Sequence, residues 1–321
     1  MFPREARSGC SPLPSRRAAR GLAALALLVA GALPARAGPA LRVCLDGDVP
    51  PLSFKRGEVT GGFDLAVSQA VAKRLGRDLD VQWFEGGRDF DDRPEQQANA
   101  LLSDGRCQLV AGYPLIADML GKPGAERARM PGYEGGTPSD RRRWVALGSL
   151  IATRGYRFEP LTVVLGPKAA GRAVRRLSDL AGLRLGVEEA TLADAVLRAY
   201  DGGRFMDQTT HVLAGRGLFE GLEGGAYDAV LVGQTEFDAY RERHPDTTLR
   251  GSGYYHSLGF NMGFVGLASE AGLVAEVSDA LGEMLAAGEL KAVARETHVT
   301  YVPPRAPDVL VSISRAALSG D

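Results

Sequence analysis

The first regular pattern in the chain is a short apolar run that ends at a turn and leads into a helix. Val43 and Leu45 lie in this run, which Pro50 and Pro51 stop, and a second turn follows at 61–62. After Asp64, apolar residues recur at helical spacing, namely Leu65, Val67, Val71 and Leu75. The pattern predicts a strand followed by an α-helix.

Similar patterns alternate through most of the remaining chain. Short apolar runs predict strands at 81–84, 107–112, 160–165, 227–232 and 260–267. Helical spacing predicts helices around 98–102, 218–222, 273–285 and 290–294. Such alternation is typical of the α/β class, in which crossover helices cover the faces of parallel sheets.

The stretch 117–148 interrupts this alternation. It is rich in glycine, proline and charged residues, including the segments 131–138 and 140–144. Loops of this length inside a compact domain are usually functional or disordered, and both interpretations stay open from the sequence.

The first 37 residues have the pattern of an export signal. Arg16, Arg17 and Arg20 precede an apolar stretch at 22–33, and residues 35–37 read Ala-Arg-Ala, a small-x-small cleavage site. The apolar stretch is too short for a membrane-spanning helix, which needs about 20 residues. We therefore expect a cleaved signal peptide at 1–37 and a periplasmic mature protein.

Charge and cysteine content narrow the possible partners. The formal net charge is −1, so no overall positive field favours nucleic acid as a partner. Cys10 lies in the predicted signal peptide, which leaves Cys44 in the first strand and Cys107 at the start of the third. In an oxidising compartment we expect these two residues to form a disulfide, with two buried free thiols as the alternative.

These segments resemble family 3 periplasmic solute-binding proteins. In that family a Tyr-Pro-Pro-Phe-type turn ends the first strand and a Gly-Phe-Asp helix start follows, as at 50–54 and 62–64 here. The segment Leu177–Val187 resembles the Leu-x-Asp-Leu-x-Gly stretch of the second lobe, and a helix-starting turn follows at 188–192. The similarity runs from about Leu41 to about Pro304.

The resemblance implies a two-lobe periplasmic-binding-protein fold, each lobe a doubly wound, mostly parallel sheet with helices on both faces. Lobe 1 would comprise 38–156 and 264–321, with 117–148 as an excursion, and lobe 2 would comprise 157–263. Two hinge crossings are expected, near 153–161 and 260–267. In such folds the ligand lies where the carboxyl ends of strands converge between the lobes.

The chain departs from amino-acid-binding members at three positions. Those members carry an aromatic residue at the first turn, an arginine after the third strand for the carboxylate, and a second-lobe aspartate for the ammonium. Val49, Met119 and the pair 233–234 stand at these positions here. Because both charged anchors are replaced, we expect no useful binding of standard amino acids.

Arginine and aromatic residues are frequent around the predicted cleft. Our candidate ligand-binding residues are Trp144, Arg142, Arg143, Arg154, Arg157, Tyr113, Thr191 and Gln234. Guanidinium groups match carboxylates, an indole offers a flat face, and the helix start at Thr191 favours an anion. This set suits a planar polycarboxylate. The alternative is a solvated charge run beside a core tryptophan.

A narrower resemblance suggests a specific ligand. The Arg-Val-Cys strand at 42–44, the Gly-Arg-Cys segment at 105–107 and the stretch His298–Pro304 look like the branch of family 3 that accompanies methanol dehydrogenases. This resemblance implies pyrroloquinoline quinone (PQQ), a planar tricarboxylate, as the bound ligand. We expect no catalytic cofactor and no metal, and a membrane transporter or a periplasmic quinoprotein dehydrogenase as the partner.

Two other functions stay open from the sequence. The chain could be an accessory protein that contacts a PQQ-dependent alcohol dehydrogenase. It could also be an enzyme similar to periplasmic cyclohexadienyl dehydratases, with Glu188, Glu189 or His256 as acid or base. The sequence contains no nucleophile elbow, phosphate loop or zinc-type spacing, so we expect a binding protein and not an enzyme.

Overall fold

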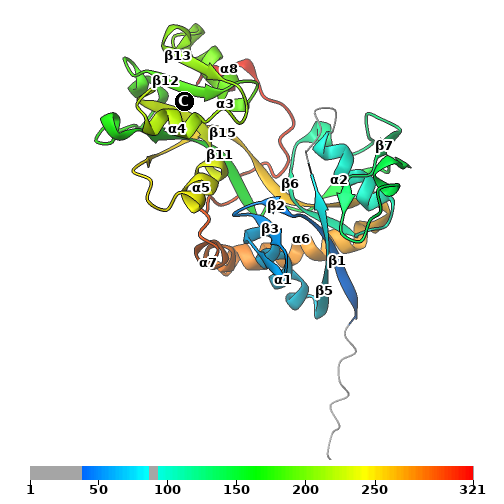
Figure 1. Cartoon of the computed structure of the whole chain (residues 1–321). Helices are drawn as coiled ribbons and strands as arrows, with labels where there is room; N and C mark the ends of the chain where they lie inside the picture. The colour runs from blue at the N-terminus through cyan, green and yellow to red at the C-terminus, as the bar shows by residue number, and fades with distance from the viewer. Residues whose placement is uncertain (1–37, 87–92, 321) are drawn as a thin grey trace, which may run out of the picture. The chain divides into compact units, whose positions relative to one another are not determined.

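The computed structural model describes residues 38–86 and 93–320, so the predicted signal peptide lies outside the described residues. Among the described residues, ten strands form one sheet in the order β13-β12-β14-β11-β15-β6-β1-β5-β8, with β10 paired to β15 (Figure 1). Two of these strands, β11 (Arg157–Leu165) and β15 (Arg250–Leu267), pair antiparallel and connect the two lobes. The predicted α/β architecture with two crossings is confirmed.

Lobe 1 is built around a mostly parallel set of strands. Its part of the large sheet contains β1 (Gly38–Asp46), β5 (Arg77–Glu85), β6 (Leu109–Pro114), β8 (Gly132–Tyr133) and β10 (Leu150–Ala152). Its helices are α1 (Phe63–Arg74), α2 (Pro94–Ser103), α6 (Ala271–Ala286) and α7 (Glu289–Glu296). Two small sheets complete it, β2 (Asp48–Val49) with β3 (Ser53–Arg56) and β4 (Val59–Gly61), and β7 (Arg127–Arg129) with β9 (Trp144–Ala146).

Lobe 2 repeats the strand-and-helix alternation. Its strands are β12 (Leu185–Glu188), β13 (Thr209–Val212) and β14 (Ala229–Gly233), and β12 runs parallel to both of the others. Its helices are α3 (Leu192–Ala199), α4 (Leu218–Glu223), α5 (Gln234–Arg243) and α8 (Arg315–Ser319).

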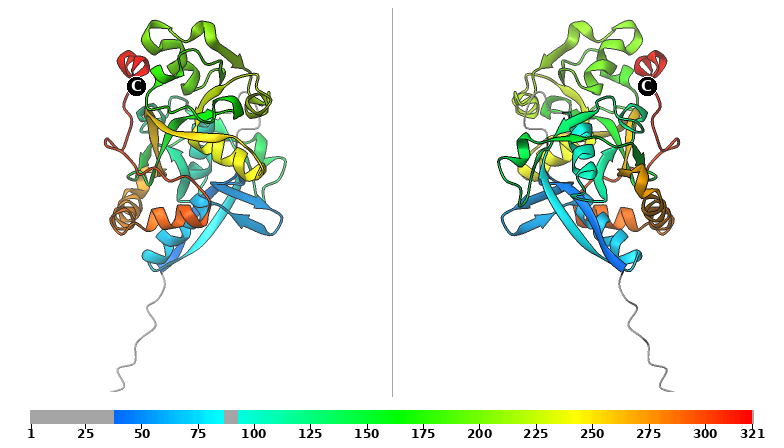
Figure 2. Two further views of the ribbon diagram at one scale, coloured as in Figure 1. Left: turned by 90° about the vertical axis from the view of Figure 1, so that its left-hand side faces the viewer. Right: turned by 90° about the vertical axis from the view of Figure 1, so that its right-hand side faces the viewer.

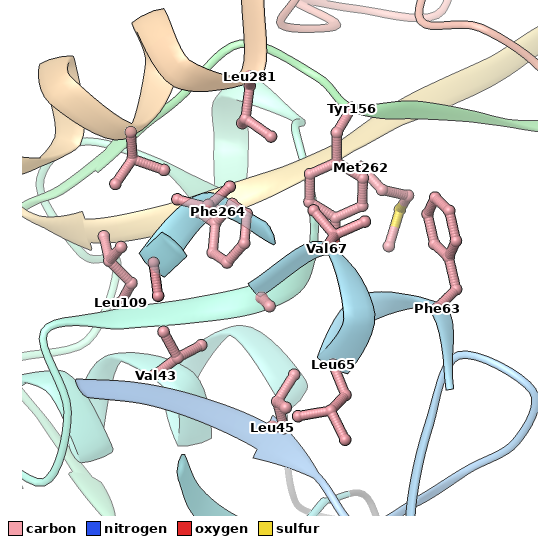
Figure 3. Packing of buried hydrophobic residues seen from close by; sticks show 14 of the residues in the cluster. Val43, Leu45, Phe63, Leu65, Val67, Leu109, Tyr156, Met262, Phe264 and Leu281 are labelled. Carbon is pink, nitrogen blue, oxygen red and sulfur yellow. The ribbon is translucent and has the colours of Figure 1, made fainter. Parts of the chain in front are cut away.

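The strand-and-helix pattern at the start of the chain folds as predicted. Val43 and Leu45 of β1 face a core that also contains Val67 of α1 and Leu281 of α6 (Figure 3). The backbone at Gly62 has φ 109°, and a side chain there would collide with the carbonyl of Leu52. Glycine is therefore required where the chain turns into α1.

The opposite face of the lobe-1 sheet holds the predicted disulfide. Cys44 points away from Val43 because side chains alternate along a strand, and it is bonded to Cys107 with their Cα atoms 5.6 Å apart. Both cysteines are buried together with Leu101 of α2 and Val265 of β15. The alternative of two free thiols is wrong.

The stretch 117–148 forms short defined elements in the structure. Strands β7 and β9 pair with each other, and β8 pairs with β5 at the edge of the large sheet. Ala128 and Val145 are buried in the same core as the disulfide, so this stretch is part of lobe 1.

The C-terminal segment (residues 299–320) contacts both lobes, whereas the predicted boundaries assign it to lobe 1 alone. Leu310 exchanges backbone hydrogen bonds with lobe 1, its N–H donating to Leu115 at 2.8 Å and its carbonyl accepting from Ala117 at 2.9 Å. The final helix α8 then lies against α3 of lobe 2 (Figure 2), where Ala317 and Leu318 pack on the core. The assignment of all of 264–321 to lobe 1 is therefore wrong for α8, because these apolar side chains are covered by lobe 2.

No helix of the described part of the chain has both the length and the apolar character that crossing a membrane requires.

Candidate ligand-binding site

The lobe-1 cavity lies beside the carboxyl ends of β1 and β6 and has a volume of about 500 Å³. Three residues singled out from the sequence, Val49, Tyr113 and Met119, line it. Its other walls combine apolar side chains with acidic ones, the latter being Asp46, Asp48, Asp64 and Glu95. A cavity therefore lies at the ends of these strands, and the charged residues described in its lining all carry carboxylates.

Asp64 is the most deeply buried of these acids, with 3% of its surface exposed. Its Oδ1 accepts a hydrogen bond from the Tyr156 hydroxyl at 2.8 Å, and that hydroxyl accepts one from the Gly112 N–H at 2.7 Å. Burial raises the pKa of Asp64, and the nearby Arg157 guanidinium partly offsets this effect. A methyl group at Gly112 would lie 2.5 Å from Asp64 Oδ2, so only glycine leaves room for the carboxylate.

The lobe-2 cavity is smaller, about 170 Å³, and lies at the ends of β12 and β14. Glu159, Glu188 and Glu236 line it together with Thr191 and Gly233. Among the described residues, neither cavity has a lysine or an arginine in its lining. Both cavities are therefore suited to positive charge.

Glu236 stands out within the lobe-2 cavity. It lies three residues into α5, and its Oε1 would be 3.0 Å from a Cβ at Gly233, while Glu159 Oε1 would be 3.4 Å from the same point. Glu236 is an exposed residue, but it lines the cavity, whose walls partly desolvate its carboxylate. This desolvation, followed by repulsion from Glu188 and Glu159, raises the pKa of Glu236 to about 7.

Glu159 is held by a fixed set of donors at the crossing between the lobes. The Thr235 N–H donates to its Oε1 at 2.8 Å, and the Thr235 hydroxyl and the Arg157 guanidinium donate to its Oε2. Arg157 is 4% exposed, and its Nε has no hydrogen-bond partner within the described structure. This arginine therefore neutralises the acids of the crossing and does not line either cavity.

Two of the other predicted arginines, Arg143 and Arg154, line neither cavity. Arg143 pairs with Asp104 at 2.6 Å. Arg154 lies against α6, where its backbone N–H donates to the Ser278 hydroxyl at 3.0 Å. The side chain of Arg142 is outside the described part of the structure. The described arginines that were predicted to hold carboxylates therefore line neither the lobe-1 cavity nor the lobe-2 cavity.

The remaining candidates have structural partners. Trp144 is half-exposed on β9 and lines neither cavity. Thr191 lines the lobe-2 cavity, but its hydroxyl caps α3 by accepting from the Asp194 N–H at 3.1 Å.

Gln234 is buried and donates to Asp238 Oδ1 at 3.0 Å. Tyr113 donates to the Met119 carbonyl at 2.9 Å, and burial raises the pKa of its hydroxyl.

The three residues considered as catalytic acids or bases lie in different surroundings. Glu188 lines the lobe-2 cavity, whereas Glu189 is exposed beside it. His256 is buried, with its Nε2 3.1 Å from the Gly320 carbonyl. Among the described residues, no group of three or more His, Cys, Asp or Glu is arranged to hold a metal ion.

Sequence reasoning missed the acidic character of the site. The carboxylates come from the ends of separate strands and from the starts of helices. No local run of acidic residues in the sequence therefore indicates the site. The usable signal was position: Asp46 ends β1, Glu188 ends β12, and Glu236 lies in the first turn of the helix after β14. Carboxyl ends of parallel strands meet at one edge of a sheet, where ligands bind.

Comparison with known proteins gives the fold. No family model matches the chain, and no curated protein matches it in sequence. The L-cystine solute receptor of Neisseria gonorrhoeae is similar in structure, with a TM-score of 0.58 and 16% identity over 83% of this chain and 96% of that one.

Two further solved structures give the same result. The second substrate-binding domain of a putative amino acid ABC transporter from Streptococcus pneumoniae has a TM-score of 0.57 and 15% identity, covering 81% of this chain and 100% of its own. An ancestral cationic amino acid solute-binding protein has a TM-score of 0.53 and 17% identity, covering 80% and 94%. The chain therefore has the two-lobe periplasmic-binding-protein fold.

Proposed function

We propose that the protein is a periplasmic solute-binding protein that captures a small organic solute carrying an ammonium group. One observation carries this proposal: the Glu236 carboxylate folds back over Gly233, beside Glu159, in the lobe-2 cavity. The sequence places no acid at 233–234, where the family resemblance expects the ammonium partner. Glu236 supplies a carboxylate next to that position from the following helical turn.

The lining disfavours a ligand that is rich in carboxylates. A planar tricarboxylate such as PQQ would bring three negative charges to walls whose described charged residues are all acidic. Like charges in a partly desolvated site repel strongly. PQQ and a quinoprotein dehydrogenase partner remain predictions of the narrower resemblance, and PQQ is the comparison ligand in the experiment below. A membrane transporter is the partner that solute capture would serve.

The α-carboxylate separates our proposal from ordinary amino-acid binding. The solved structures reported above are named for amino-acid solutes, but no described guanidinium lines the lobe-1 cavity here. We expect 1,5-diaminopentane, which is lysine without its carboxylate, to bind at least about tenfold more tightly than L-lysine, since an unpaired carboxylate in the site costs about 1–3 kcal/mol. Calorimetry on the mature chain, with agmatine and L-arginine as a second pair, measures the difference.

The same titration includes PQQ, for which we expect no saturable binding at concentrations that saturate the amines. Glu236→Gln should weaken amine binding about tenfold or more, whereas the matched variant Glu189→Gln, one position beyond the cavity residue Glu188, should leave it unchanged. Saturable PQQ binding that Glu236→Gln strengthens would overturn the amine proposal and favour the polycarboxylate. Binding of L-lysine as tight as that of the diamine would show that another group holds the carboxylate.

Affinity for the diamine should also depend on pH through Glu236. An ammonium group favours the ionised carboxylate, and the pKa of free Glu236 is about 7, so a proton must leave before binding at lower pH. Affinity should therefore rise by up to tenfold per pH unit below pH 7 and level off above it. Calorimetry between pH 5.5 and 8.5 tests this, and Glu236→Gln should flatten the profile. A wild-type profile that is already flat would contradict the assignment.

A further inference from the structure

A two-stranded ribbon formed by β7 and β9 presents a distinct outward face. Arg129 pairs with Trp144, Ala128 with Val145 and Arg127 with Ala146 across the ribbon. Because side chains alternate along strands, Ala128 and Val145 are buried, while Arg127, Arg129 and Trp144 point outward. Two arginines and a tryptophan therefore share one exposed face.

Trp144 is unusual for its exposure. Half of its surface (50%) is accessible, whereas Trp83, the other tryptophan of the chain, is buried. The Arg129 guanidinium lies over the indole ring at 5.4 Å, and Arg127 donates to the Trp144 carbonyl at 3.1 Å. The ring thus packs against Arg129, while half of the residue stays accessible to solvent. Tryptophan and arginine are among the residue types that most often dominate protein–protein binding energy when a partner covers them.

The charges on this ribbon are not balanced locally. Neighbouring arginines are paired, Arg143 with Asp104 at 2.6 Å and Arg141 with Glu85 at 3.2 Å. The side chains of Arg127 and Arg129 have no carboxylate partner among the described residues, and both contact Trp144. In a chain whose net charge is −1, the face carries two unpaired positive charges around an aromatic ring. Its complement is an acidic surface.

The buried side of the ribbon connects this face to the lobe-1 cavity. Both strands of the ribbon contact α2 (Figure 1). On α2, the residues Glu95, Gln97 and Ala98 line the cavity. One helix therefore carries the ribbon on one side and part of the cavity wall on another.

We propose that the outward face of the β7–β9 ribbon is a docking surface for an acidic region of a partner protein. Trp144 provides the apolar contact, and Arg127 and Arg129 provide the charge pairing that orients it. The position of the ribbon on α2 places the partner next to the wall of the solute cavity. This assignment goes beyond solute capture and does not depend on which solute is bound.

The test titrates the mature chain with poly-L-glutamate, an acidic polypeptide probe. Binding is measured through the fluorescence emission of Trp144 in a Trp83→Phe background. We expect saturable binding that weakens as salt is raised. Charge reversal by Arg127→Glu with Arg129→Glu should reduce affinity at least tenfold. The matched control Arg216→Glu with Arg250→Glu, two exposed arginines of lobe 2, should reduce it less than twofold. Both double variants should keep the far-ultraviolet circular dichroism spectrum of the parent protein, which shows that they are folded.

Trp144→Ala distinguishes docking from simple ion pairing. A docking surface requires the ring, so this variant should bind the probe about tenfold more weakly. Calorimetry measures the affinity, because the variant lacks the fluorescent reporter. Attraction of the probe by charge alone would leave the affinity unchanged. Equal losses in the ribbon and control pairs would overturn the proposal. Vesicles of phosphatidylglycerol that bind through Trp144 more tightly than poly-L-glutamate would assign the face to a membrane surface and also overturn it.

Discussion

Removal of the Cys44–Cys107 disulfide is expected to lower the free energy of unfolding by about 4 kcal/mol. The bond joins residues 63 positions apart, and closing a loop of that length removes roughly this much entropy from the unfolded chain in the loop-closure model. The cysteines lie in the core between α2 and the sheet. The bond therefore links β1 to the segment just before β6. The ends of these two strands line the lobe-1 cavity.

Urea unfolding of the double variant Cys44→Ala/Cys107→Ala measures the loss, because alanine leaves no polar atom in the core. Wild-type protein unfolded in a reducing agent is the matched comparison, and the two should agree within about 1 kcal/mol. A double variant as stable as the oxidised wild type would show that residual structure in the unfolded chain already holds these segments together.

Replacing Arg157 with methionine is expected to cost about 3–5 kcal/mol, the typical loss when one partner of a buried ion pair is removed. The guanidinium donates to Glu159 and lowers the pKa of Asp64. Without it, two acids at the crossing between the lobes lose their compensating charge. Arg154→Met is the matched control: Arg154 is 41% exposed and lies 3.9 Å from Asp279, so its loss should cost less than about 1 kcal/mol.

The defect of Arg157→Met should depend on pH. In the variant the pKa of Asp64 rises further above its unfolded value of about 3.9. The folded state then holds a proton that the unfolded state has released, so the free energy of unfolding falls as pH increases from about 4 toward the folded pKa. Chemical unfolding at pH 4 and pH 8 measures this, and the loss should be smaller at pH 4. A loss that does not change with pH would indicate that packing of the arginine stem accounts for its effect.

Local patterns predicted the elements that carry their own signals. The apolar spacing after Asp64 gave α1, and the segment around Leu177–Val187 gave β12 and the start of α3. In contrast, the first half of β15 contains Gly, Ser, Tyr and His, with no apolar run. Pairing with β11 makes it a strand. Tertiary contacts decided that element, and no single-sequence pattern contains them.

The site was less predictable than the fold for a related reason. Arg142, Arg143 and Trp144 are adjacent in sequence, and this proximity predicted one shared binding site. In the structure, however, Arg143 precedes β9 and pairs with Asp104, whereas Trp144 begins β9 and points outward. Glu236 gave the opposite problem, because its role arises from a helical turn that brings it back over Gly233. Proximity in the sequence and proximity in the site are thus different properties here.

The C-terminal segment also determines where a probe can be attached. Gly320 lies beside His256 on β15, and α8 lies on α3. A fluorophore attached at Gly320 would therefore move with lobe 2, although the chain has just left lobe 1 at Leu310. A measurement of lobe closure by energy transfer therefore needs its second dye on α1 or α7 of lobe 1. A dye on α3 of lobe 2 would give a constant signal whether or not solute is bound.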